Sequence, residues 1–131
     1  MAAAASAAAG ACALIDHACA ERFAAAWIAA WNSHDLARIL AHYADDFRMR
    51  SPLIADLADE PSGALAGKAA IGAYWATALA RLPDLHFELL TILLGVESVT
   101  LYYRGPRGLA AEVFEFGADG LVARASAHYA R

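Results

Sequence analysis

Large apolar residues recur at intervals of four in the N-terminal part of the chain. Cys19, Phe23, Trp27 and Trp31 form a single stripe, and Asp16 precedes them in a position suited to a helix N-cap. This spacing predicts a long amphipathic helix from Asp16 to Trp31, with one side buried.

Two more helices are predicted further along the chain. Asn32-Ser33-His34-Asp35 interrupts the first pattern, and Asp35 can cap a short second helix whose buried side reaches Tyr43. Phe47-Arg48-Met49-Arg50 alternates as a strand does, and residues 53–67 are expected to be mostly irregular, with turns and a short hairpin. Residues 68–82 predict the third helix, which Pro83 closes.

Beyond Pro83 the apolar period changes from about four to two. The predicted strands cover residues 85–94, 96–104, 109–116 and 121–129, and hairpin-length turns separate them. Such strands run antiparallel as a meander, and helices followed by a sheet indicate an α+β fold. We expect residues 1–14 to form a flexible alanine-rich leader and residues 15–131 a single domain.

Composition and charge exclude several classes of function. The 131-residue chain has a net charge of -4 and no basic stripe, so no nucleic-acid partner is expected. Its apolar runs are shorter than the roughly 18 residues of a membrane span, which indicates a cytoplasmic protein without a membrane partner. Cys12 and Cys19 have no metal-ligand spacing, and the histidines form no cluster. No metal and no cofactor are expected.

Three short motifs carry a resemblance to a known family. They are Trp31-Asn32-Ser33-His34-Asp35, Tyr43-Ala44-Asp45-Asp46-Phe47 and Gly67-Lys68-Ala69-Ala70-Ile71. Their order and spacing resemble the nuclear transport factor 2-like (NTF2-like) superfamily, nearest to its SnoaL-like and ketosteroid isomerase-like branch. The resemblance implies a cone-shaped fold, in which a strongly curved, mostly antiparallel sheet wraps the long first helix around a cavity. The family includes isomerases, polyketide cyclases and non-catalytic binding domains, so the fold alone does not decide function.

The resemblance also assigns candidate site residues. In ketosteroid isomerase-like enzymes an aspartate before a proline is the general base, and a tyrosine and a protonated aspartate stabilise the oxyanion. The base position falls on Ser51, which has no evident partner base, and the tyrosine position falls on Trp27, which can donate a hydrogen bond but cannot exchange a proton. The third position falls on Glu112, which keeps a carboxyl group.

Glu112 is therefore the candidate catalytic residue. Strand alternation puts it on one face with Ala110 and Phe114, toward the expected cavity, where burial would raise its pKa. The alternative is a surface glutamate that pairs with Arg104 or Arg124 on a neighbouring strand.

Aromatic residues are the other candidates for the pocket. The resemblance places Tyr102 and Tyr129 on the cavity side, where with Phe114 they would contact a bound apolar molecule, although core tyrosines are equally common. His86 and Glu88 share a strand face and could form a base with its orienting group. The opposite face is more apolar, which favours an outward orientation for both.

An apolar outer sheet face predicts self-association. We expect a homodimer that covers the side chains of Leu90, Ile92, Leu94, Val99 and Leu101. Three functions remain open: a cofactor-free isomerase, cyclase or hydratase that acts on a small apolar carbonyl compound, a module that binds a small hydrophobic ligand without reaction, and a dimerisation domain with a filled interior.

Overall fold

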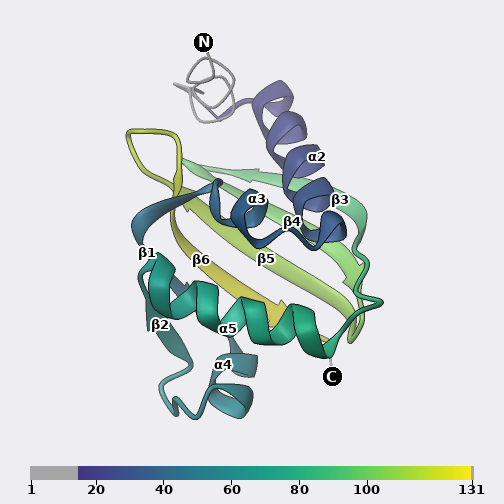
Figure 1. Ribbon diagram of the computed structural model, residues 1–131. Coiled ribbons are helices and arrows are strands. Elements are labelled where there is room, and N and C mark those ends of the chain that lie inside the picture. The colour runs from purple at the N-terminus through teal and green to yellow at the C-terminus, as the bar shows by residue number, and fades with distance from the viewer. Residues whose placement is uncertain (1–14, 131) are drawn as a thin grey trace.

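A computed structural model describes residues 15–130, so the predicted leader at residues 1–14 lies outside the described residues. Helices pack on one face of a six-stranded curved sheet (Figure 1), which confirms the predicted α+β fold. The helices are α2 (His17–Ser33), α3 (Leu36–Leu40), α4 (Pro52–Leu57) and α5 (Lys68–Arg81). The strands are β1 (Tyr43–Arg50), β2 (Ala64–Ala66), β3 (Glu88–Gly95), β4 (Ser98–Gly105), β5 (Gly108–Phe116) and β6 (Val122–Tyr129).

Both predicted N-caps are confirmed. The Asp16 carboxylate accepts a hydrogen bond from the Cys19 amide at 2.8 Å and so begins α2. The Asp35 carboxylate accepts one from the Arg38 amide at 3.2 Å and begins α3. Between them His34 adopts a left-handed conformation, with φ 59°, which ends α2 and turns the chain.

The helix α4 is the element that the sequence interpretation missed. Its N-cap is Ser51, whose hydroxyl oxygen accepts a hydrogen bond from the Leu53 amide at 3.1 Å, and Pro52 occupies its first position. A serine followed by a proline is a known signal for a helix start, because proline needs no backbone hydrogen bond there. This signal lies directly before residues 53–67, which we expected to be mostly irregular and which contain the rest of α4.

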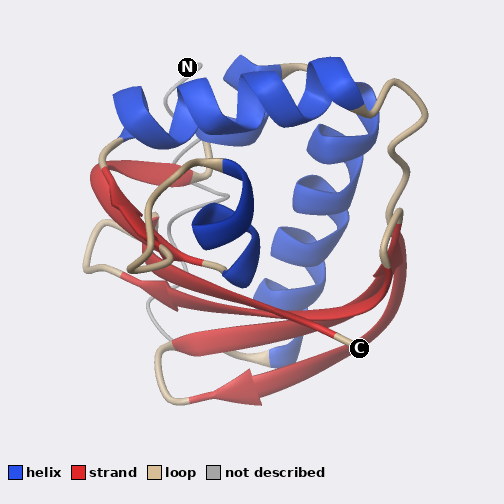
Figure 2. Cartoon of the chain, turned by 90° about the horizontal axis from the view of Figure 1, so that it is seen from below, coloured by secondary structure: helices blue, strands red, loops and turns tan. Residues whose placement is uncertain are grey.

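The sheet has the strand order β2-β1-β6-β5-β4-β3. All neighbouring strands pair antiparallel except β1 and β6, which run parallel, and the predicted meander forms β3 to β6. The sheet bends around α2 and α5, so that its concave face carries the helices (Figure 2). Tyr43, expected on a helix, begins strand β1.

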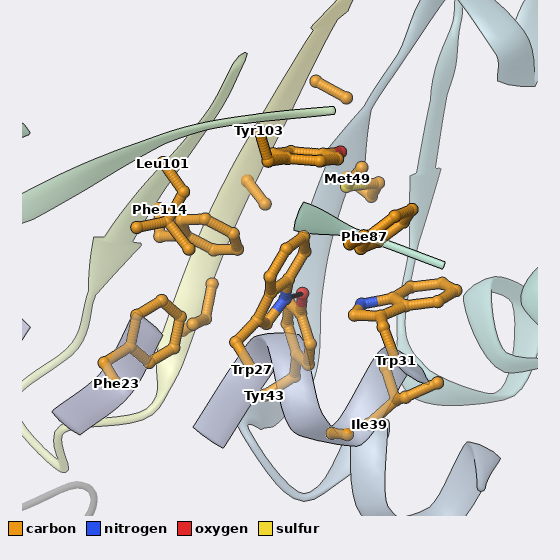
Figure 3. Packing of buried hydrophobic residues seen from close by; sticks show 14 of the residues in the cluster. Phe23, Trp27, Trp31, Ile39, Tyr43, Met49, Phe87, Leu101, Tyr103 and Phe114 are labelled. Atoms are coloured by element: carbon orange, nitrogen blue, oxygen red, sulfur yellow. Dashed lines mark hydrogen bonds between the residues drawn. The ribbon is translucent and has the colours of Figure 1, made fainter. Parts of the chain in front are cut away.

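The core lies between α2 and the concave face of the sheet. Trp27 is 1% exposed at its centre, where its ring contacts those of Trp31, Phe87, Tyr103 and Phe114 (Figure 3). Residues from α2, β4 and β5 and the segment before β3 therefore meet around one indole ring.

The predicted outer face needs a correction. Val99 and Leu101 point into the core, at 1% and 0% exposure, because the Val99, Leu101 and Tyr103 face of β4 is its more apolar face. A register shift in β3 between Leu89 and Thr91 also turns Ile92 toward the core. Next to the inward pair Ile92 and Leu101, the outer face of β3 and β4 carries the pair Leu93 and Thr100. The homodimer stays a prediction.

None of the helices described between residues 15 and 130 is long and apolar enough to cross a membrane.

Candidate functional site

A cavity of about 90 Å³ lies between α5, the segment before β3 and the strands β4 to β6. Its walls contain seven aromatic residues, among them the only three tryptophans of the chain, Trp27, Trp31 and Trp75. Small residues at four lining positions leave the space open, and these are Ala78, Gly105, Gly108 and Ala110. The exposed Pro106 and Arg107 line its mouth. A volume of this size holds a few water molecules or a short organic group.

Glu112 is the buried carboxyl group of this cavity. It is 4% exposed, and the Tyr103 hydroxyl donates a hydrogen bond to its Oε1 at 3.1 Å. Burial raises the pKa of Glu112 from 4.5 to about 7, although the Tyr103 hydrogen bond acts in the opposite direction. The carboxyl group is therefore divided between its acid and base forms near neutral pH, as general acid–base chemistry requires.

The surface alternative for Glu112 is excluded by the ion pairs. Arg104 lies 3.9 Å from Glu88, and Arg124 lies 3.6 Å from Glu115, both at exposed positions on the sheet. The two arginines that could have paired with Glu112 thus have other partners, and Glu88 points outward as predicted.

Tyrosine hydroxyls surround the carboxyl group. Burial and the charge of Glu112 raise the pKa of Tyr103, of Tyr129 and of the fully buried Tyr43. All three phenols therefore stay protonated at neutral pH and can donate hydrogen bonds. Tyr103 and Tyr129 line the cavity, and because the Tyr103 hydroxyl already donates to Glu112, Tyr129 is the one of the two that can donate to a bound molecule.

Trp27 and Ser51 line the cavity, but their polar groups already have partners. The Trp27 Nε1–H donates a hydrogen bond to the Tyr43 hydroxyl oxygen at 2.9 Å. The Ser51 hydroxyl accepts the capping bond of α4, and a hydrogen bond to Ser51 partly offsets the raised pKa of Tyr129. Both residues therefore position tyrosines and backbone.

Two predicted ligand contacts lie elsewhere. Tyr102 points to the outer face of the sheet, opposite Thr91 and Ala111, since its neighbour Tyr103 occupies the inner face. Phe114 is fully buried, but it packs against the rings of Phe23 and Trp27 and does not line the cavity. Tyr103 is thus the residue that the sequence interpretation missed.

The corner after α2 braces one wall of the cavity. The Asn32 side chain accepts a hydrogen bond from the Phe87 amide at 2.7 Å and donates one to the Phe87 carbonyl at 3.0 Å. The His34 Nε2 lies 2.8 Å from the Leu85 carbonyl oxygen. Phe87 and Leu85 both line the cavity, so these side chains anchor the loop that precedes β3 and forms part of the cavity wall.

The cavity wall also contains a polar atom without a partner. Among the buried side-chain nitrogen and oxygen atoms of the residues that the structure describes, Trp31 Nε1 is the one that lacks a hydrogen bond. Within residues 15–130, histidine, cysteine, aspartate and glutamate side chains form no cluster of three or more that could hold a metal ion.

A sequence profile of the SnoaL-like domain matches residues 24–125, which include nearly the whole sheet and the cavity walls. The chain belongs to the SnoaL-like family. A crystal structure of a SnoaL-like protein of unknown function from Burkholderia thailandensis E264 is 55% identical to this SnoaL-like chain. The alignment covers 90% of this chain and 99% of that one, with a TM-score of 0.88.

More distant structures share the fold of this SnoaL-like domain. A candidate isomerase of the SnoaL-like family from Agrobacterium tumefaciens is 20% identical, with 82% and 94% of the two chains covered and a TM-score of 0.65. TerC co-crystallized with polyporic acid is 16% identical, with 82% and 88% covered and a TM-score of 0.67. A comparison with curated proteins finds no match.

Proposed function

We propose that this SnoaL-like domain catalyses proton transfer next to the carbonyl group of a small apolar molecule, as an isomerase or cyclase does. The observation that carries the proposal is the buried Glu112 carboxyl group in an aromatic cavity, with a pKa of about 7. A carboxyl group with this pKa can both remove and return a proton near neutral pH.

The proposed reaction uses Glu112 and a tyrosine. The Glu112 carboxylate removes a proton from the carbon beside the carbonyl group, and the resulting enolate keeps the electron pair. The Tyr129 hydroxyl, whose raised pKa keeps it protonated, donates a hydrogen bond to the enolate oxygen. Glu112 then returns the proton to another carbon. In a cyclisation the enolate carbon instead attacks a second carbonyl carbon of the same molecule, the π electrons of that carbonyl move to its oxygen, and Glu112 gives its proton to this oxygen.

Tyr103 would position the base. Its hydroxyl donates to one carboxyl oxygen of Glu112, and within residues 15–130 this is the one hydrogen bond that the carboxyl group makes. The other oxygen is therefore available for substrate. Named relatives support the reaction class, because an SnoaL-like protein of this fold carries the name of a candidate isomerase.

The test is deuterium exchange into a small ketone, cyclopentanone, followed by NMR in heavy water. We expect the wild-type protein to accelerate exchange of the hydrogens next to the carbonyl group, and Glu112→Gln to slow it by about 100-fold or more. Glu115→Gln is the matched control, because Glu115 lies on the same strand but is exposed and paired with Arg124. Equal rates in the wild-type and Glu112→Gln proteins would remove Glu112 from the mechanism.

Ligand binding without reaction is the second candidate function. It is favoured by Ser51 and Trp27, whose polar groups are occupied by the α4 cap and by Tyr43. Two of the three positions that carry chemistry in ketosteroid isomerase-like enzymes would then have only structural roles. Binding of cyclopentanone without any acceleration of exchange would select this function.

A further inference from the structure

The mouth of the cavity carries one cation. Apart from three tyrosines, Glu112 and Arg107 are the residues with ionisable side chains among the lining residues, and Arg107 is exposed in the turn between β4 and β5. Ion pairs between described residues join His17 to Glu21, Lys68 to Asp45, Arg104 to Glu88 and Arg124 to Glu115. Arg107 takes part in none of these pairs.

The turn that carries Arg107 is held in place. Gly105 and Gly108 are paired across the hairpin, and only Pro106 and Arg107 stand between them. Proline fixes its own φ, and Gly108 adopts a positive φ of 97°. A Cβ atom on Gly105 would lie 3.2 Å from the Phe87 ring, so the turn packs tightly against the cavity wall.

The Arg107 charge reaches both sides of the opening. Burial raises the pKa values of Tyr74 on α5 and Tyr129 on β6, and the Arg107 charge opposes part of this rise at both groups. These two tyrosines line the cavity from different elements. The guanidinium group therefore lies within electrostatic reach of both walls.

We propose that the cavity selects apolar molecules that end in a carboxylate, with Arg107 holding the carboxylate at the mouth. The planar guanidinium group matches a carboxylate with two parallel hydrogen bonds. Glu112 disfavours a second anion at the inner end, so the opposite charges of the two residues set one orientation. The apolar part of the ligand then lies among the tryptophans and reaches Glu112. This inference rests on the proposed function, since it names the class of substrate for the same site.

Hexanoate and hexanamide are matched probes for this proposal, because they share shape and differ in charge. All three tryptophans line the cavity, so intrinsic tryptophan fluorescence of the full chain reports on it directly. Near neutral pH we expect the wild-type protein to bind hexanoate about five-fold more tightly than hexanamide, the size of effect that one exposed ion pair gives. Added salt should weaken hexanoate binding and leave hexanamide binding unchanged.

Three variants decide whether Arg107 causes the preference. Arg107→Gln should bind both probes equally, and Arg107→Lys should keep part of the preference, because it keeps the charge but loses the planar fork. Arg104→Gln is the matched control, since Arg104 lies on the same hairpin but is exposed and paired with Glu88. It should keep the full preference.

Several outcomes would overturn the proposal. They are equal binding of both probes by the wild-type protein, a preference that survives in Arg107→Gln, and equal losses in Arg104→Gln. If Arg107→Gln does not fold, the Lys variant and the salt dependence give the same decision. Failure here is distinct from failure of the proposed function, which is measured by Glu112-dependent exchange in the neutral cyclopentanone.

Discussion

The concave face of the sheet has two ends that differ in packing. At the closed end, Leu101 and Phe114 are fully buried, and Phe114 meets the Phe23 ring of α2 at 4.9 Å between centroids (Figure 3). At the open end, Tyr103 lies two residues after Leu101 and Glu112 two residues before Phe114, on the same face, and both border the cavity. The two ends meet where Leu101 lies directly opposite Glu112.

The difference lies in what the neighbouring positions supply. Phe114 is covered by the rings of Phe23 and Trp27. Tyr103 pairs with Ala110, and Glu112 lies between Leu101 on β4 and Ala127 on β6, so small residues flank this pair on β5 and β6. Small residues leave space, and a polar group bordering a cavity avoids part of the cost of burial in a closed core. One strand thus contributes both a core residue and a buried carboxyl group, two positions apart.

The largest expected effect comes from identical truncations at the two ends. Leu101→Ala should lower the free energy of unfolding by about 2–5 kcal/mol, because it leaves a void in a closed core. Leu53→Ala, at the half-buried mouth of the cavity, should cost about 1 kcal/mol or less, since it removes less buried surface. Urea unfolding of both variants measures the difference, and equal costs would show that the two ends are packed alike.

A smaller effect should follow from the titration of Glu112. Its pKa is raised in the folded protein, so the folded state binds the proton more tightly than the unfolded state. The contribution of protonated Glu112 to the free energy of unfolding is complete below pH 4.5 and is lost as the pH rises to about 7. The difference between 4.5 and about 7 corresponds to about 3 kcal/mol.

Unfolding curves of wild-type and Glu112→Gln proteins over this pH range measure that contribution. The wild-type protein should lose stability relative to the variant as the pH rises, because glutamine stays neutral. Glu115→Gln serves as the control and should follow the wild-type curve. Parallel curves for the wild-type and Glu112→Gln proteins would mean that Glu112 titrates as a solvated side chain, and the open end would lose its distinctive group.

Residue patterns predicted most of the fold and one member, Glu112, of the hydrogen-bonded pair Tyr103 and Glu112. The helix stripe, both aspartate caps and the strand period indicate the elements directly, and alternation places Glu112 on the inner face. Tyr102 was wrongly placed on the cavity side, where Tyr103 lies, because the resemblance rather than the pattern of β4 decided which face was inner. The alternation of Val99, Leu101 and Tyr103 contained the correct answer.

Other features could not be predicted from residue types. The register shift beside Leu89 changes which residues of β3 face the core, and a bulge depends on the geometry of both strands. The hydrogen bond from the Trp27 indole to the Tyr43 hydroxyl joins residues 16 apart in sequence. It forms only when α2 lies against β1. The volume of the cavity likewise depends on how the sheet curves around α2.

The smallest expected effect tests how the open end keeps its shape. Asn32→Ala removes both hydrogen bonds to the Phe87 backbone, which should lower the free energy of unfolding by about 1–2 kcal/mol. Amide hydrogen exchange at Phe87 should accelerate, because the segment before β3 loses its brace. Asn32→Asp keeps the acceptor for the Phe87 amide and should slow that exchange again. If exchange at Phe87 in Asn32→Ala matched the wild type, the His34 contact to Leu85 and the aromatic packing of Phe87 would be enough to hold this wall of the cavity.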